Sequence, residues 1–350
     1  MRPLAALLVL FLLAACAPRL QPPGIEMAEP SLRDDAIVMD DGAVLPLRQW
    51  LPAGAPRAVV LALHGFNDYS NAFTSPAARW AESGIATFAY DQRGFGKTPH
   101  RGVWPGEQRM IEDLRAAAAL LRARHPTVPL YILGESMGGS VIMAAATSSD
   151  PPAADGLILA APAVWGRETQ GPLQSSFLRF AAHTVPWLPL TGEGLNVHPS
   201  DNIPMLRQLA RDPLVIKETR VDAIYGLVNL MDMAYDAGPH LTGRVLVLYG
   251  AREDILPEDA VVATLRRMPA DADHALRIAL YPRGYHMLLR DLNAAEVLDD
   301  VVAWIADPEV PLPSGGDTLA VTLLKGKVDD LEAAAARAAD VPPPGTAPKS

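Results

Sequence analysis

The 350-residue sequence predicts an α/β fold, with a mostly parallel central sheet, flanking helices and one inserted helical lid. Short β-rich apolar runs alternate with helical runs, which is typical of a parallel sheet covered by helices on both faces. The alternation stops once, over residues 165–240, and a structureless loop of that length is improbable inside a compact domain. Because 49% of the residues are hydrophobic and 20% are charged, the chain can bury a large core.

The chain begins with a predicted lipoprotein signal peptide over residues 1–15. Arg2 precedes an apolar run that is too short for a comfortable membrane span and has the proportions of a signal peptide. Small residues then precede Cys16, the only cysteine, and this resembles a bacterial lipobox, in which the cysteine becomes the lipidated first residue. An ordinary secretory signal is the alternative. The lipobox predicts a protein of the bacterial cell envelope, periplasm-facing or surface-exposed, which a lipid anchor tethers to the membrane surface.

The core elements are expected over residues 36–164 and 241–307, after a Pro-rich spacer at residues 16–35. Two early runs, "AIVM" and "LPLRQWL", are expected to be antiparallel edge strands. Strands of the parallel sheet are expected at "AVVLALHG", "IATFAYD", "PLYILGES", "GLILAAPAV", "RVLVLYG" and "LRIALYP". Most of these runs are continuously apolar, as in strands that are buried on both faces. Helices are expected between them, for example at "EQRMIEDLRAAAALLRARH" and "EDAVVATLRRM".

The lid is expected over residues 165–240, where strands like those of the core are missing. Its large apolar residues either line a binding site or only pack the lid against the core, and they include Trp165, Phe177, Phe180, Trp187, Leu206, Leu227, Leu230, Met231 and Met233. After the core, residues 308–350 contain a possible Ala-rich helix and end in "VPPPGTAPKS". We expect them to form a weakly ordered C-terminal tail.

The strongest chemical signal is G-x-S-x-G at Ser136, in "LYILGESMGGS". It lies directly after a predicted strand and before a predicted helix, which is the context of a nucleophile elbow. The glycines allow a sharp turn that exposes the serine hydroxyl, and the N-terminus of the next helix favours negative charge. We therefore predict Ser136 as a nucleophile rather than as part of a structural turn.

A serine hydroxyl needs a base, and His286 in "YPRGYHMLL" is the predicted one. It follows the last predicted strand, and in this fold the base follows the serine and the acid along the chain. His64 precedes the serine, so its order is wrong for the base. His64 with the following glycine suits an oxyanion loop instead, in which the backbone N–H groups of Phe66 and Met137 hold the oxyanion.

Several other functions are excluded by what the sequence lacks. The segment "RGFGKT" is not a phosphate-binding loop, because Asp91 stands where such a loop requires glycine. No H-E-x-x-H motif or cysteine cluster is present, so we expect no metal. A net charge of −10 without a basic patch makes nucleic-acid binding a poor expectation, and the sequence indicates no protein partner.

Five motifs occur in an order that resembles one known family: "LALHGFNDYSNAF", "FAYDQRGFGKT", "LGESMGG", "YGAREDILP" and "YHMLLRD". Over about residues 36–306 the chain is similar to serine hydrolases of the α/β-hydrolase fold, of the monoacylglycerol lipase or lysophospholipase-like group. The resemblance implies hydrolysis of carboxylic esters of single-chain lipids through an acyl-enzyme, without a cofactor. It places Asn67 and Asp68 near the substrate head group, and we count His64 with them as substrate-binding. An aminopeptidase of the same fold and a non-catalytic envelope lipoprotein are the alternatives.

The acid is the point at which the sequence departs from that group's pattern. The group has an aspartate in G-x-x-D-x-x-x-P, whereas counting from Gly250 to Pro257 without a gap puts Glu253 at the acid position. Glutamate is an accepted acid in this fold. A local shift would bring Asp254 to the histidine instead. We predict Glu253 and retain Asp254 as the alternative acid.

Overall fold

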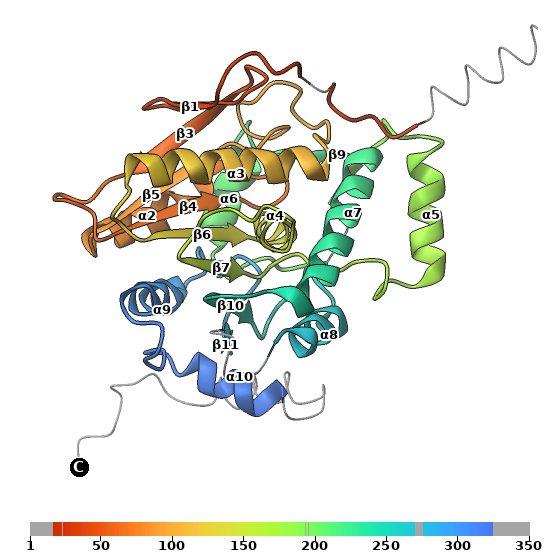
Figure 1. The fold of residues 1–350 in the computed structure, drawn as a ribbon. Coiled ribbons are helices and arrows are strands. Elements are labelled where there is room, and N and C mark those ends of the chain that lie inside the picture. The colour runs from red at the N-terminus through yellow and green to blue at the C-terminus, as the bar shows by residue number, and fades with distance from the viewer. Residues whose placement is uncertain (1–16, 23, 193, 195, 270–275, 325–350) are drawn as a thin grey trace, which may run out of the picture.

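The computed structural model describes residues 17–22, 24–192, 194, 196–269 and 276–324. Nine strands of these residues form one sheet in the order β1-β2-β3-β5-β4-β6-β7-β10-β11, which runs through the middle of the molecule (Figure 1). Neighbouring strands are parallel from β5 to β11 and antiparallel from β1 to β5. The predicted α/β fold, with its mostly parallel sheet, is confirmed.

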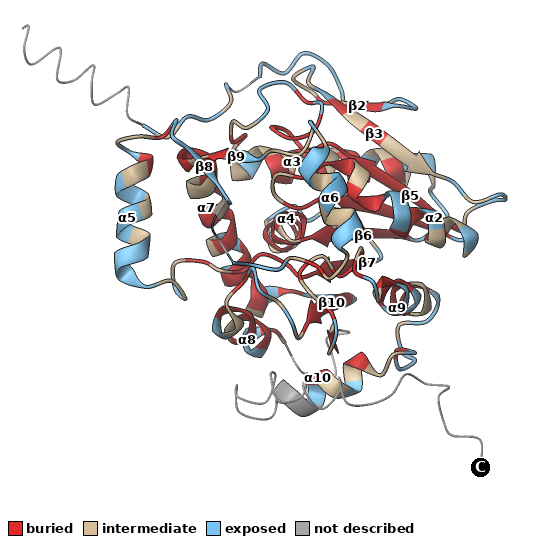
Figure 2. Ribbon diagram, turned by 180° about the vertical axis from the view of Figure 1, so that it is seen from behind, coloured by how far each residue is buried: buried red, intermediate tan, exposed pale blue. Residues whose placement is uncertain are grey.

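The strands coincide with the apolar runs of the sequence. Their bounds are β1 Ser31–Leu32, β2 Ala36–Val38, β3 Val44–Trp50, β4 Ala58–Leu63, β5 Ile85–Tyr90, β6 Leu130–Glu135, β7 Gly156–Ala160, β10 Val245–Gly250 and β11 Leu276–Tyr281. Every residue of β4, β5, β6, β7 and β10 is buried, because helices cover both faces of the sheet (Figure 2). The early runs form β2 and β3, which are antiparallel as expected, but neither is the edge of the sheet, because β1 lies outside β2. Part of the predicted spacer, β1, joins this edge.

Helices pack on both faces of the sheet, with α3 against α4 and α2 against α9. Their bounds are η1 Ser70–Phe73, α2 Thr74–Glu82, α3 Glu107–Arg124, α4 Met137–Ala146, α8 Glu258–Arg267, α9 Ala294–Ala306 and α10 Gly316–Leu324. Trp80 of α2 is fully buried and donates a hydrogen bond to the backbone of Leu298 in α9. Among the described helices, none has the length and apolar character that crossing a membrane requires.

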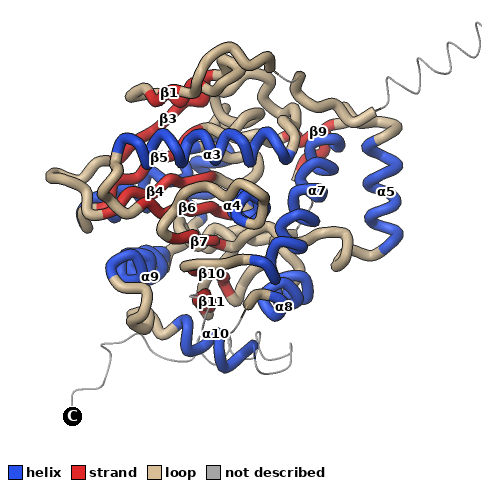
Figure 3. Tube along the Cα trace, viewed as in Figure 1, coloured by secondary structure: helices blue, strands red, loops and turns tan. Residues whose placement is uncertain are grey.

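The insertion between β7 and β10 is mainly helical and contains α5 Pro172–Ala182, β8 Pro189–Thr191, α6 Ile203–Arg211, β9 Glu218–Arg220, α7 Val221–Ala237 and η2 Gly238–His240. Helix α7 packs against α4 of the core, and α5 packs against α7 on the side away from the sheet (Figure 3). The antiparallel ribbon of β8 and β9 is absent from the sequence prediction, since both strands are only three residues long.

The C-terminal segment differs from the expected weakly ordered tail over residues 308–324. There α10 packs on β11, and Leu312 is buried. Asp300 of α9, which is fully buried, accepts a hydrogen bond from the backbone N–H of Ser314 at 3.0 Å. These contacts attach the segment to the core. The predicted Ala-rich helix lies outside the described residues.

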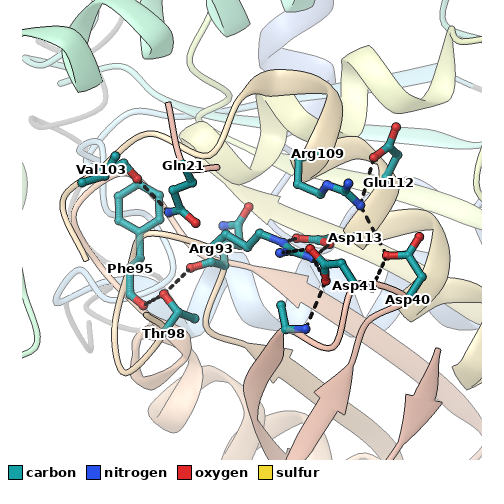
Figure 4. Close-up of polar contacts among 12 residues, drawn as sticks. Gln21, Asp40, Asp41, Arg93, Phe95, Thr98, Val103, Arg109, Glu112 and Asp113 are labelled. Atoms are coloured by element: carbon teal, nitrogen blue, oxygen red, sulfur yellow. Dashed lines mark hydrogen bonds and ion pairs between the residues drawn. The ribbon is translucent and has the colours of Figure 1, made fainter. Parts of the chain in front are cut away.

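A buried ion cluster around Arg93 joins three parts of the core (Figure 4). The guanidinium lies 2.6 Å from the Asp113 carboxylate of α3 and 2.8 Å from that of Asp41, in the turn between β2 and β3. Nearby, Gln21 donates to the backbone oxygen of Val103 at 2.8 Å, so the start of the described chain lies against the same region. The "DQRGFGKT" segment therefore has a structural role in this fold.

Candidate active site

Ser136 lies at the turn between β6 and α4, and the turn is sharp. Its backbone has φ 53° and ψ −117°, outside the regions that most residues adopt. Glycines make this turn possible, because a Cβ on Gly138 would lie 2.3 Å from the backbone oxygen of Leu63. A Cβ on Gly134 would lie equally close, 2.3 Å, to the backbone of Gly138. This local geometry, held by tight packing, exposes the Ser136 hydroxyl to the cavity described below.

His286 follows β11 and brings its ring to the serine. Its Nε2 lies 2.9 Å from the Ser136 Oγ, and its Nδ1 lies 2.7 Å from the Glu253 Oε2. A carboxylate only accepts hydrogen bonds, so the Nδ1 carries the ring proton and the Nε2 lone pair faces the serine. The two contacts form the hydrogen-bonded chain that an activated serine requires.

The structure brings Glu253, and not Asp254, to the histidine. The second oxygen of Glu253 accepts hydrogen bonds from the backbone N–H groups of Ile255 and Leu256, at 2.8 and 3.0 Å, which fixes the carboxylate. Asp254 faces the other way and accepts a hydrogen bond of 2.7 Å from the backbone N–H of His198 in the lid. The adjacent acids thus have different partners.

The environment of His286 favours its protonated form. Burial alone disfavours the charged imidazolium, but the carboxylates of Glu253 and Glu135 outweigh burial, so the pKa of His286 lies above its ordinary value. Arg290 acts in the opposite direction. The side chain is only 8% exposed, which limits screening of these charges by water.

The loop after β4 comes close to the nucleophile. A Cβ on Gly65 would lie 3.3 Å from the Ser136 Cβ, so Phe66, the next residue, lies beside the serine. Met137 is the first residue of α4, and a backbone N–H in the first turn of a helix has no partner within the helix. Phe66 and Met137 thus lie on either side of Ser136 along the two loops, and the oxyanion role of their amides stays a prediction.

The structure corrects the expectation for His64. Its ring is fully buried, does not line the cavity and therefore does not contact a substrate there. The Nδ1 lies 2.8 Å from the backbone oxygen of Gly65, and the Nε2 accepts from the backbone N–H of Gln92 at 3.0 Å. Burial lowers the pKa of His64, in keeping with a neutral ring. His64 holds the loop after β4 in place.

A cavity of about 800 Å³ opens from Ser136 and His286 between the core and the lid. Its lining is mostly apolar, and several of the lid residues singled out in the sequence contribute to it: Trp165, Phe177, Leu227 and Met231. The others, Phe180, Trp187, Leu206, Leu230 and Met233, do not. This size and lining are those of a site for a small molecule with a long apolar part.

Asn67 and Asp68 also line the cavity, close to the serine. Asn67 has φ 65° and donates a hydrogen bond of 2.7 Å to the Thr219 hydroxyl of the lid. The Asp68 carboxylate lies 2.8 Å from the Arg290 guanidinium, so its charge is compensated. Within the described residues, no cluster of three or more His, Cys, Asp or Glu side chains is placed to hold a metal ion.

Comparison with known proteins identifies the family of the chain. Its sequence matches the family described as serine aminopeptidase, S33, over residues 54–293, which is more than half of the chain. The chain belongs to this family.

Two lipases are among the curated relatives of this chain. Monoacylglycerol lipase of Mycolicibacterium smegmatis is 25% identical over 268 residues, which cover 73% of this chain and 90% of the relative. Human monoglyceride lipase is 25% identical over 281 residues, which cover 77% of this chain and 89% of the relative. A soluble variant of Saccharomyces cerevisiae monoglyceride lipase, solved with a substrate analog, has the same fold with a TM-score of 0.66, 19% identity, and coverage of 83% and 99%.

Two charged residues beside Ser136 and His286 were not predicted from the sequence. Arg290 and Glu135 both line the cavity, and their charged groups lie 3.0 Å apart. Glu135 occupies a variable position of G-x-S-x-G, and Arg290 lies four residues after His286 in "YHMLLRD". Their proximity to the two motif residues was the signal available in the sequence.

Proposed function

We propose that this protein is a serine hydrolase that cleaves carboxylic esters of single-chain lipids, as monoacylglycerol lipases and lysophospholipases do. One observation carries the proposal: the hydrogen-bonded chain of Ser136, His286 and Glu253 opens into an apolar cavity of about 800 Å³. The chain of contacts suits acyl transfer, and the cavity suits a fatty acyl chain. The names of the two lipase relatives agree with both inferences.

The reaction proceeds in two steps. The Ser136 Oγ attacks the ester carbonyl while the His286 Nε2 takes its proton, and Glu253 stabilises the resulting imidazolium. The backbone N–H groups of Phe66 and Met137 stabilise the oxyanion of the tetrahedral intermediate. His286 then gives its proton to the leaving alcohol, and the acyl-enzyme forms. Water, deprotonated by the same ring, attacks the acyl-enzyme, and the proton returns to the serine as the fatty acid leaves.

A fluorophosphonate probe tests the nucleophile. Wild-type protein should be labelled, and the Ser136→Ala variant should not, while its melting temperature stays close to that of the wild type. Equal labelling of both proteins would refute the assignment. A panel of monoacylglycerols, lysophospholipids and p-nitrophenyl esters of increasing chain length then tests the substrate class, for which we expect preference for long single chains.

The description of the family as aminopeptidases makes peptide cleavage the alternative activity. A free α-amino group would require an available carboxylate near Ser136. Asp68 and Glu135 line the cavity, but both carboxylates are already paired with Arg290. We therefore expect p-nitrophenyl acyl esters to be cleaved in preference to aminoacyl-arylamides, and the reverse order would favour the peptidase. Measurable ester turnover also rules out a non-catalytic envelope lipoprotein.

We further propose that Cys16, which lies outside the described residues, carries a lipid anchor in the bacterial cell envelope. The described chain starts beside the lid, where the backbone N–H of Arg19 donates to Asp222, in the first turn of α7. The neighbouring outer surface of the lid exposes Phe180 and Trp187, which are 66% and 53% exposed. The anchored protein would therefore present its lid toward the membrane, whichever side of the envelope it faces.

Detergent phase partition tests the anchor. Wild-type protein expressed with its N-terminus should enter the detergent phase and incorporate labelled palmitate. The Cys16→Ser variant should do neither, and it should remain at its precursor mass. Labelling of the variant would contradict a lipid on this cysteine.

A further inference from the structure

Three buried charged side chains form a cluster directly beside the candidate site, and we refer to Asp68, Arg290 and Glu135 as the site cluster. The Arg290 guanidinium lies 2.8 Å from the Asp68 carboxylate and 3.0 Å from that of Glu135. The side chains are only 9%, 8% and 3% exposed, respectively. Their interactions are therefore weakly screened by water.

Each member of the site cluster belongs to a segment that supplies one part of the reaction. Asp68 lies two residues after Phe66 in the loop after β4. Glu135 directly precedes Ser136 at the end of β6. Arg290 lies in the loop that carries His286, and its backbone oxygen accepts a hydrogen bond from Asn202 of the lid at 2.8 Å. One guanidinium thus joins the oxyanion loop, the nucleophile turn and the base loop.

Stability alone is a weak explanation for such a cluster. Removing three charged groups from water is costly, and well-packed apolar residues often stabilise a fold as much as a buried ion pair or more. A guanidinium does something here that apolar residues cannot do, because it donates a hydrogen bond to the Glu135 carboxylate at 3.0 Å and forms an ion pair with the Asp68 carboxylate at 2.8 Å at the same time. The cluster is therefore better explained by a role in fixing the relative positions of the three segments that carry it.

We propose that Arg290 is a positioning residue. It holds the oxyanion loop, the nucleophile turn and the His286 loop in the relative positions that the reaction requires. This inference rests on the proposed ester hydrolase activity. Arg290 acts through Asp68 and Glu135 rather than on the reacting atoms. A lysine ammonium at this position keeps the charge, but as a point charge it does not span both carboxylates as the guanidinium does, so the Arg290→Lys variant separates charge from position.

The site cluster also contributes to the electrostatic environment of His286. Three charged groups face the ring: Glu253 after β10, Glu135 at the end of β6, and Arg290 from its own loop, to which Asp68 is bound. The Glu135 charge favours the protonated ring and the Arg290 charge disfavours it. The Glu135→Gln variant removes a negative charge while it keeps the shape of the side chain. It should therefore lower the pKa of His286.

The experiment compares Arg290→Lys with a matched control, Arg93→Lys. Arg93 also lies between two buried carboxylates, those of Asp41 and Asp113, but its partners belong to the β2–β3 turn and α3. Active-site titration with the fluorophosphonate counts competent molecules, and kcat is expressed per titrated site. We expect Arg290→Lys to lower kcat about 10- to 100-fold, with KM changed less than about threefold, because a misplacement of about 1 Å has effects of this size. Arg93→Lys should keep kcat within about twofold.

The pH profile of kcat/KM provides the second readout. The acid limb of Glu135→Gln should move to lower pH, whereas that of Arg290→Lys should stay in place, since the charge is kept. The inference is overturned if kcat per site of Arg290→Lys stays within about twofold of the wild-type value, or falls only as far as that of Arg93→Lys. Failure of the proposed ester hydrolase activity would look different from failure of this inference, because wild-type protein would then show neither labelling nor ester turnover.

Discussion

At the scale of single residues, Glu253 and Asp254 are neighbours with opposite orientations. Glu253 binds the His286 ring, and Asp254 binds the lid backbone at His198. Glu253→Gln should lower kcat about 10³-fold or more, because an amide no longer fixes the correct ring tautomer or stabilises the imidazolium.

Asp254→Asn is the matched control for that variant, since asparagine still accepts the hydrogen bond from His198. Asp254 is 44% exposed, and exposed pairs contribute little. We expect kcat within about threefold of the wild-type value in ester hydrolysis. If Asp254→Asn were the variant with the large loss, the observed pairing of Glu253 with His286 would not be the catalytic one.

The pH dependence of the reaction follows from His286. The ring must be neutral to accept the serine proton, and its pKa lies above the ordinary value of 6.5. Activity should therefore fall as the pH drops, with the acid limb of kcat/KM above pH 6.5. In Glu253→Gln the residual activity should have its acid limb at lower pH, because the largest contribution that raises the pKa is gone. An acid limb below pH 6.5 in the wild type would contradict this prediction.

At the scale of elements, two arginine ion pairs show how burial changes the contribution of an ion pair to stability. Arg93 joins α3 to the β2–β3 turn with 10% of its side chain exposed, whereas Arg79 joins α2 to Asp299 of α9 with 42% exposed. Arg93→Met leaves two buried carboxylates uncompensated and should lower the free energy of unfolding by about 3–5 kcal/mol. Arg79→Met should lower it by less than about 1 kcal/mol in the same urea titration. Equal losses would show that burial does not set the cost here.

The elements also show which features the sequence could predict. The strands β4, β5, β6, β7 and β10 were predictable because covering both faces of a sheet demands continuous apolar runs. The serine turn was predictable because its chemistry and its strand–turn–helix context are local. The ribbon of β8 and β9 was not, since it is short and β8 is exposed, so it carries no periodic signal.

The role of Arg290 was not predictable for a different reason. Its two partners, Asp68 and Glu135, are 222 and 155 residues away in the sequence, and only the fold brings them together. His64 was misassigned because a histidine beside an oxyanion loop looks the same in sequence whether it faces the substrate or the core. Its hydrogen bonds to Gly65 and Gln92 appear only in three dimensions.

At the scale of the whole molecule, the C-terminal segment is part of the core as far as the structure describes it. Helix α10 packs on β11, and Leu312 and Ala320 are buried. A protein ending at residue 307 should therefore have a clearly lower melting temperature than one ending at residue 324. Differential scanning fluorimetry of both, beside the full chain, checks this, and identical melting temperatures for the two truncations would show that α10 adds no stability.

The segment of the lid at residues 198–200 is hydrogen-bonded to both loops that carry the acid and the base. His198 is bound by Asp254, next to the acid, and the backbone oxygen of Pro199 accepts a hydrogen bond from Met287, next to the base. Ser200 is bound to Asp291 on the same loop as the base. This stretch thus contacts both the acid loop and the base loop, and a lid movement that broke these hydrogen bonds would remove a support of both. We therefore expect substrate to enter past other parts of the lid, with residues 198–200 left in place.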